Sequence, residues 1–194
     1  EDEEALERAM SLMSFPGMAD QISPLIDEIF PEDSVRVMGE PGRYLVSACS
    51  AVVVSVTSVR SNLANKDNAE GSEETAVAAR DDFAYYLNEG VYGPFNNLIW
   101  DDTLHVRPRL LRSNPIKSTN HNEDVLYPST IFGPTCDAGD VVNRSVLLPQ
   151  LEIGDCLYYE NLGAYTSSSA CTFNGFSLAK KYYTCSVLPE MLEE

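Results

Sequence analysis

The stretch from Tyr44 to Val59, YLVSACSAVVVSVTSV, marks the point at which the chain changes from helical to β character. Val52, Val54 and Val56 recur with a period of two, against serine and threonine on the other face. This period places apolar side chains along one side of a β-strand. We therefore predict a strand here and a change of fold class at this point of the chain.

Short strand-like segments separated by turn residues follow this stretch. They are FAYYLN (83–88), FNNLIW (95–100), HVRPRLL (105–111), DVLYPSTIF (124–132), CLYYEN (156–161), FNGF (173–176) and YYTCSVL (182–188). The polar segment 62–81, which precedes the first of them, predicts a mobile surface loop. Many short strands and few helices are typical of a β-barrel or sandwich, so we predict a mainly β domain over residues 50–194.

The residues before this stretch have a helical rhythm. Apolar residues at helical spacing predict helices over 2–13 and 18–30, and Pro31 ends the second. A short buried strand is predicted over 34–38, before a loop that carries charged residues. This order is the repeating unit of a (β/α)8 barrel, whose functional groups lie at the strand C-termini. We therefore predict that this part of the chain belongs to a βα barrel.

The composition excludes several classes of partner. The chain has 30 acidic and 13 basic residues, and its net charge of -17 argues against nucleic acid and anionic membranes. Five cysteines without a CxxC pair, and only two histidines, argue against a disulfide framework and a metal site. No apolar run approaches the roughly 20 residues of a membrane helix. We therefore expect a cytoplasmic protein with reduced thiols.

Four stretches combine glycine or proline turns with charged, thiol or aromatic side chains. They are GEPGRYLV (39–46), GVYGPFNNLIWDD (90–102), FGPTCDAGD (132–140) and NLGAYTSSSACTFNGF (161–176). In the third stretch Cys136 stands beside Asp137, and these residue types leave a catalytic acid, a metal ligand and a buried thiol open.

Together these stretches resemble the C-terminal half of the eukaryotic-type ornithine decarboxylases. These belong to the alanine-racemase-like, or group IV, decarboxylases, which depend on pyridoxal 5'-phosphate. The resemblance runs from about Met18 to Val187 and rests on EPGRY (40–44), YYLNEGVYGPFN (85–96), GPTCDAGD (133–140), LPQLEIGDCLYYENLGAYT (148–166) and FNGF (173–176). It implies a homodimeric enzyme of polyamine biosynthesis that decarboxylates L-ornithine to putrescine. It also implies that residues 1–49 are the C-terminal tail of a cofactor-binding (β/α)8 barrel and that residues 50–194 are the C-terminal β domain.

The resemblance implies a cofactor site. Glu40 would face the pyridine nitrogen and keep the ring protonated, which makes the cofactor an electron sink. Arg43 would bind the phosphate through charge-assisted hydrogen bonds, helped by the close backbone approach at Gly42. Tyr165 would donate its hydroxyl to the same phosphate.

The resemblance also implies a substrate site shared between two subunits. Asp101 would bind the distal ammonium of the substrate, and Asp137 of the partner subunit would bind it too. Two carboxylates around one ammonium select a diamino acid. Cys136 would return a proton to the substrate's α-carbon as a general acid. Phe173 would line the shared pocket, and Asp140 would bridge the dimer.

Two features depart from the family pattern. The family's catalytic lysine lies on an early barrel strand, and none of the four lysines here has such a place: Lys66, Lys117, Lys180 and Lys181. We therefore expect the chain alone to be inactive. Trp100 stands where the family has tyrosine, and the segment after it is one residue longer, which leaves Asp101 and Asp102 both open as the ammonium ligand.

Several alternatives stay open. Lysine, arginine and diaminopimelate are other possible substrates, although an aspartate after the cysteine favours ornithine over diaminopimelate. The second functional hypothesis is an inactive regulatory paralogue, like antizyme inhibitor or prozyme. An antizyme-like regulatory protein is a further possible partner. The presence of five predicted site residues favours an active enzyme: Glu40, Arg43, Cys136, Asp137 and Tyr165.

Overall fold

The computed structural model describes residues 11–32, 34–62, 81–100, 106–111 and 125–185. The chain divides into two compact units, Glu1–Pro41 and Gly42–Glu194. The predicted polar loop lies almost entirely outside the described residues, as do residues 2–10 of the first predicted helix. Within the described ranges no helix is both long enough and apolar enough to span a membrane.

The first unit contains the helix α2, Phe15–Ile29. Its N-cap is Ser14, whose hydroxyl accepts a hydrogen bond from the N–H of Gly17 at 3.2 Å. At the other end the N–H of Phe30 donates to the Ile26 carbonyl at 2.8 Å, and a proline follows. The helix predicted over 18–30 is therefore confirmed, with a start three residues earlier.

The strand predicted over 34–38 is wrong. These residues are exposed and have no strand conformation. A strand needs a neighbour to accept its backbone hydrogen bonds, and the described part of this unit contains no strand that could pair with it. The assignment of residues 1–49 to a barrel tail stays a prediction.

The second unit opens with two short helical elements before its first strand. Gly42–Val46 form α3 and Ser47–Cys49 form the 3-10 helix η1, so the β character predicted from residue 44 onward begins later. The Ser47 hydroxyl donates to the Arg43 carbonyl at 2.7 Å. This local hydrogen bond favours the helical turn over an extended chain.

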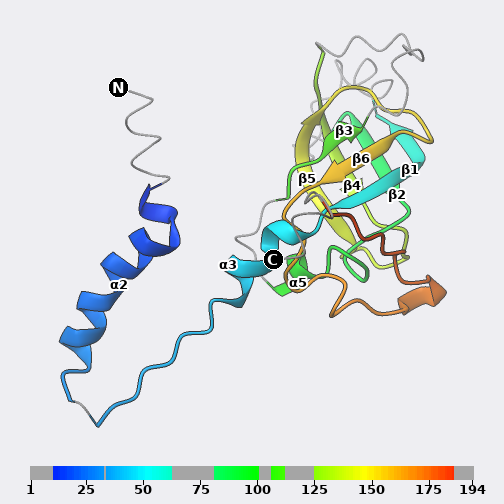
Figure 1. Ribbon diagram of the computed structural model, residues 1–194. Coiled ribbons are helices and arrows are strands. Elements are labelled where there is room, and N and C mark those ends of the chain that lie inside the picture. Colours follow the sequence, from blue (N-terminus) through cyan, green and yellow to red (C-terminus); the bar gives the residue numbers. More distant parts are fainter. Residues whose placement is uncertain (1–10, 33, 63–80, 101–105, 112–124, 186–194) are drawn as a thin grey trace, which may run out of the picture. The chain divides into compact units, whose positions relative to one another are not determined.

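Six strands form one curved, twisted sheet in the second unit (Figure 1). They are β1 Val52–Ser61, β2 Phe83–Leu87, β3 Arg109–Leu111, β4 Tyr127–Phe132, β5 Val141–Leu148 and β6 Cys156–Tyr159. Their order in the sheet is β3-β6-β1-β2-β4-β5. The pair β2–β4 is parallel and the other pairs are antiparallel. The mainly β fold predicted for this part of the chain is confirmed.

Three predicted strands contain no strand in their described residues. FNNLIW is a turn followed by the helix α5, Asn97–Trp100, and FNGF contains the 3-10 helix η2, Phe173–Gly175. Residues 182–185 are exposed and form no strand. The turn before α5 has a local cause: the side-chain amide of Asn96 donates to the Val91 carbonyl at 2.9 Å.

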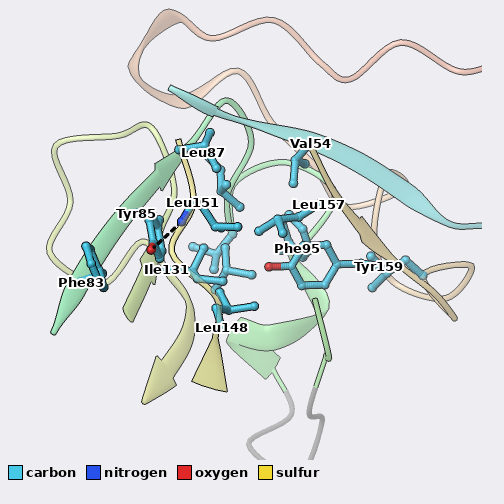
Figure 2. Packing of buried hydrophobic residues seen from close by; sticks show 14 residues of the cluster. Val54, Phe83, Tyr85, Leu87, Phe95, Ile131, Leu148, Leu151, Leu157 and Tyr159 are labelled. Atoms are coloured by element: carbon cyan, nitrogen blue, oxygen red, sulfur yellow. Dashed lines mark hydrogen bonds between the residues drawn. The ribbon is translucent and has the colours of Figure 1, made fainter. Parts of the chain in front are cut away.

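The core of the second unit lies on one side of the sheet, where alternate residues of the strands are buried (Figure 2). Tyr85 of β2 is fully buried, and its hydroxyl accepts a hydrogen bond from the N–H of Leu151 at 3.0 Å. Burial raises the pKa of Tyr85. Phe95 packs edge-on against Tyr159 of β6 with ring centres 4.8 Å apart. Since Phe95 lies in the turn after β2, the core anchors that turn.

Candidate active site

Two residues predicted to bind the cofactor phosphate lie against each other. The guanidinium carbon of Arg43, on α3, lies 5.1 Å from the ring centre of Tyr165, which is a cation–π distance. The loop that carries Tyr165 packs on this helix, and the N–H of Gly163 donates to the Ser47 carbonyl at 2.9 Å. A Cβ at Gly163 would lie 1.7 Å from the Val46 carbonyl oxygen, so only glycine allows this approach. The structure therefore brings a cation and a phenol together.

Only some of the other residues predicted to bind cofactor or substrate lie in the described part of the chain. Glu40 is exposed in the segment that ends the first unit. Gly42 begins α3, and a Cβ there would meet no atom within 4 Å, so open space lies beside its backbone. Asp101 and Asp102 lie outside the described residues. The roles of these four residues stay predictions.

Cys136 is exposed in the loop 133–140, which joins β4 to β5. Two backbone hydrogen bonds close the loop. The N–H of Gly133 donates to the Asp140 carbonyl at 2.9 Å, and the N–H of Asp140 donates to the Asp137 carbonyl at 3.0 Å. The Cys136 thiol lies 4.0 Å from Oδ1 of Asn174, to which it is a weak donor. The fold of this chain by itself therefore does not bury the thiol. Among the described residues no group of three acidic, thiol or imidazole side chains could hold a metal ion.

Asp140 ties this loop to the turn after β2. Its side chain is 1% exposed. Oδ1 accepts from the N–H of Val91 at 2.8 Å, and Oδ2 accepts from the N–H and the hydroxyl of Thr135 at 3.0 and 2.7 Å. Gly90 and Gly133 make room, because a Cβ at either would come within 2.2 and 2.1 Å of Oδ1. These partners all belong to the same chain, and the role of Asp140 in a dimer interface stays a prediction.

The sheet topology explains why the two segments meet. β2 and β4 are parallel neighbours, with Tyr86 opposite Phe132. Parallel strands end at the same edge of a sheet, so the turn 90–93 and the loop 133–140 leave from the same edge. Asp140 then holds them together at that edge.

The carboxylate of Asp137 is held by two donors from these segments. Oδ1 accepts from the N–H of Gly139 at 2.9 Å, and Oδ2 accepts from the hydroxyl of Tyr92 at 2.5 Å. The bond from Tyr92, and after it the bond from Gly139, holds the pKa of Asp137 below its usual value. The bond to Asp137 also raises the pKa of Tyr92 to about 12. At neutral pH the carboxylate is therefore charged and the phenol remains a donor.

Phe173, the predicted pocket wall, stacks on Tyr92 with ring centres 4.2 Å apart. It begins η2, in which Asn174 adopts a left-handed φ of 59°. The N–H of Cys171 donates to the Tyr92 carbonyl at 2.9 Å. These contacts join five side chains, which we call the thiol–carboxylate cluster: Tyr92, Cys136, Asp137, Phe173 and Asn174.

Sequence reasoning missed two members of this cluster. Tyr92 lies in GVYGPFN and Asn174 lies in FNGF, and neither was given a role although both motifs were singled out. The signal that could have indicated a role for them is their position between turn residues and beside other predicted site residues. Their partners are distant in sequence, so spacing alone does not reveal the contacts.

Comparison with known proteins identifies the family of this chain. Residues 43–163 match the family model of the pyridoxal-dependent decarboxylase C-terminal sheet domain. Ornithine decarboxylase of Cricetulus griseus is 38% identical over 175 residues, which are 90% of this chain and 36% of that protein. Antizyme inhibitor 2 of Xenopus laevis is 36% identical over 178 residues, 89% of this chain and 36% of that protein.

A solved structure has a similar fold. The arginine decarboxylase of Paramecium bursaria Chlorella virus, bound to agmatine, superposes with a TM-score of 0.59 and 34% identity. The match covers 84% of this chain and 38% of that one. The chain thus spans little more than a third of the length of these relatives. The matched sheet domain covers more than half of the chain, which therefore belongs to the pyridoxal-dependent decarboxylases.

Proposed function

We propose that this chain takes part in the decarboxylation of L-ornithine to putrescine, as the C-terminal portion of a homodimeric enzyme that uses pyridoxal phosphate. The observation that carries the proposal is the thiol–carboxylate cluster. It presents an ionised carboxylate, Asp137, beside an exposed thiol, Cys136. A diamino acid needs an anion for its distal ammonium, and decarboxylation needs a proton donor for the α-carbon.

The residues present fit the cofactor. Arg43 offers a permanent cation and Tyr165 a phenol hydroxyl, and the two side chains lie together. Open space beside Gly42 leaves its backbone accessible to a phosphate. When bound, pyridoxal phosphate accepts the electron pair that departing CO2 leaves at the α-carbon. Glu40 would hold the protonated ring nitrogen by its negative charge.

The other residues would act on the substrate. Asp137, with Asp101 or Asp102 of the other subunit, would bind the distal ammonium and so fix the substrate along the pocket. Phe173 would exclude water from the apolar part of the side chain. Cys136 would then protonate the α-carbon: its S–H bond breaks as the new C–H bond forms, and a thiolate remains.

A second candidate function has one specific observation in its favour. The chain is 36% identical to an antizyme inhibitor over 89% of its length. The presence of both Arg43 with Tyr165 and the thiol–carboxylate cluster favours the enzyme, because a protein that only binds a partner does not need these side chains. An assay of the full-length protein with ornithine, lysine and arginine separates the alternatives: CO2 release from ornithine supports the proposal, and no release from any of the three supports the regulator.

Asp137→Ala is expected to raise the KM for L-ornithine by about 10- to 100-fold, the worth of a hydrogen bond to a charged group. The distal ammonium then loses one of its two anions. Steady-state kinetics of the full-length enzyme give this value, and Asp155→Ala, on the loop before β6, is the control with unchanged KM. A KM within twofold of the wild type for Asp137→Ala contradicts the role of this carboxylate.

Subunit sharing predicts complementation between variants. Arg43→Ala and Cys136→Ala would each inactivate both sites of a homodimer, but a mixed dimer would have one site with neither change. Random mixing of equal amounts is expected to restore roughly a quarter of the wild-type activity, because half of the dimers are mixed and each has one intact site. If mixed dimers form and the activity stays at the level of the parent variants, each site is built from one subunit.

A further inference from the structure

Tyr92 stands out among the described residues because its hydroxyl, its ring and its carbonyl each make a separate contact. Its hydroxyl donates to Oδ2 of Asp137, its ring stacks on Phe173, and its carbonyl accepts from the N–H of Cys171. The turn that carries it is anchored by the buried ring of Phe95. A half-buried tyrosine is thus fixed from three sides, with its hydroxyl aimed at a residue of the candidate site.

We propose that Tyr92 is a positioning residue, whose hydroxyl orients the carboxylate of Asp137 for the distal ammonium of the substrate. The inference rests on the proposed function, since it assigns Asp137 to the substrate. It adds a determinant of diamino acid specificity that does not need to touch the ammonium itself.

The geometry explains how one hydroxyl can do this. An exposed aspartate on a loop normally rotates among several conformations. Here Tyr92 binds Oδ2 and the N–H of Gly139 binds Oδ1, so both oxygens of Asp137 are fixed. Each carboxylate oxygen can accept a second hydrogen bond, which remains for the substrate. A carboxylate that is already oriented loses less conformational freedom when the ligand binds.

The electrostatics act in the same direction. A hydrogen bond to the charged form of a carboxyl group stabilises that form, and the bond from Tyr92 is the first cause of the lowered pKa of Asp137. Only the ionised form attracts an ammonium. Tyr92, with its pKa raised to about 12, remains protonated and so donates throughout the pH range of the enzyme.

The test is Tyr92→Phe in the full-length holoenzyme, which keeps the ring stack and removes only the hydroxyl. We expect the KM for L-ornithine to rise about 10-fold with kcat within about twofold of the wild type. We also expect the acid limb of kcat/KM to move to higher pH, because the pKa of Asp137 rises when it loses its donor. A change that only loosened the fold would lower kcat and the melting temperature without moving this limb.

A matched control and a double variant sharpen the test. Tyr86→Phe removes the hydroxyl of another tyrosine stacked on a phenylalanine, Phe132, at 5.2 Å, and is expected to change neither KM nor the acid limb. In an Asp137→Asn background, Tyr92→Phe should have little further effect on KM, because its role runs through Asp137. Two results would overturn the inference. One is a double variant whose KM increase is the product of the two single increases, and the other is an unchanged KM and acid limb in Tyr92→Phe alone.

Calorimetric titration with putrescine separates this inference from the proposed function. Weaker putrescine binding in Tyr92→Phe than in the wild type supports the positioning role even if ornithine is not turned over. Turnover of ornithine with putrescine binding unchanged by Tyr92→Phe contradicts the inference and leaves the proposed function intact.

Discussion

Cys136→Ala in the full-length enzyme is expected to lower putrescine formation from L-ornithine by about 10²- to 10⁴-fold, the usual contribution of a positioned general acid. The thiol is exposed, so its removal leaves no cavity and the fold should persist. Arg43 and Tyr165, the residues proposed to bind the cofactor, are untouched, and cofactor absorbance should be unchanged. Parallel assays of CO2 and putrescine should show CO2 released in excess of the correct product.

Cys156→Ala is the control for this experiment. Its thiol is half-buried at the start of β6, near the Gly154 carbonyl at 3.8 Å, and has no part in the proposed chemistry. The control should form putrescine at the wild-type rate. Wild-type putrescine formation by Cys136→Ala as well would mean that another group donates the proton.

Asp140→Ala is expected to lower the free energy of unfolding by about 3 kcal/mol. The carboxylate is almost fully buried and accepts from two backbone N–H groups and one hydroxyl. Its removal leaves the buried N–H of Val91 and the part-buried N–H of Thr135 without their acceptor. Urea unfolding with an unchanged slope gives the difference directly.

Asp81→Ala provides the comparison. Asp81 also has three donors, from Thr130 and from the N–H and hydroxyl of Ser145, but its side chain is partly exposed. Water can replace the lost acceptor there, so the expected loss is about 1 kcal/mol. Equal losses at both positions would show that burial does not set the cost. If the effect of Asp140→Ala depends on protein concentration, its main partner is the other subunit.

The fold was predictable where the local sequence of a segment determines its conformation. The alternating valines of β1 and the capped helix α2 are such segments, because period and cap lie within a few residues. β5 was not predicted. Its middle is exposed and polar at Arg144 and Ser145, and Ser145 has a left-handed φ of 49°. This irregularity breaks the period of two on which the prediction of strands depends.

The site was predictable as a set of residues but not as a set of contacts. The turn motifs pointed to Cys136 and Asp137, and the resemblance assigned their roles. The hydrogen bond from Tyr92 to Asp137 depends on the parallel pairing of β2 and β4 and on its register, and no local pattern encodes either. The same holds for Asp140, whose partner Val91 lies 49 positions away in the chain.

The parallel pairing of β2 and β4 also has a consequence for how this domain can diversify. The turn 90–93 and the loop 133–140 are joined directly by Asp140, so their relative position does not depend on the length of the chain between them. That intervening chain includes Asp101 and Asp102. Under the proposed function, insertions or deletions there would change the length of the diamino acid accepted, while Cys136 and Asp137 keep their geometry. Under the proposed function, substrate range and acid catalysis would therefore be separable by mutation.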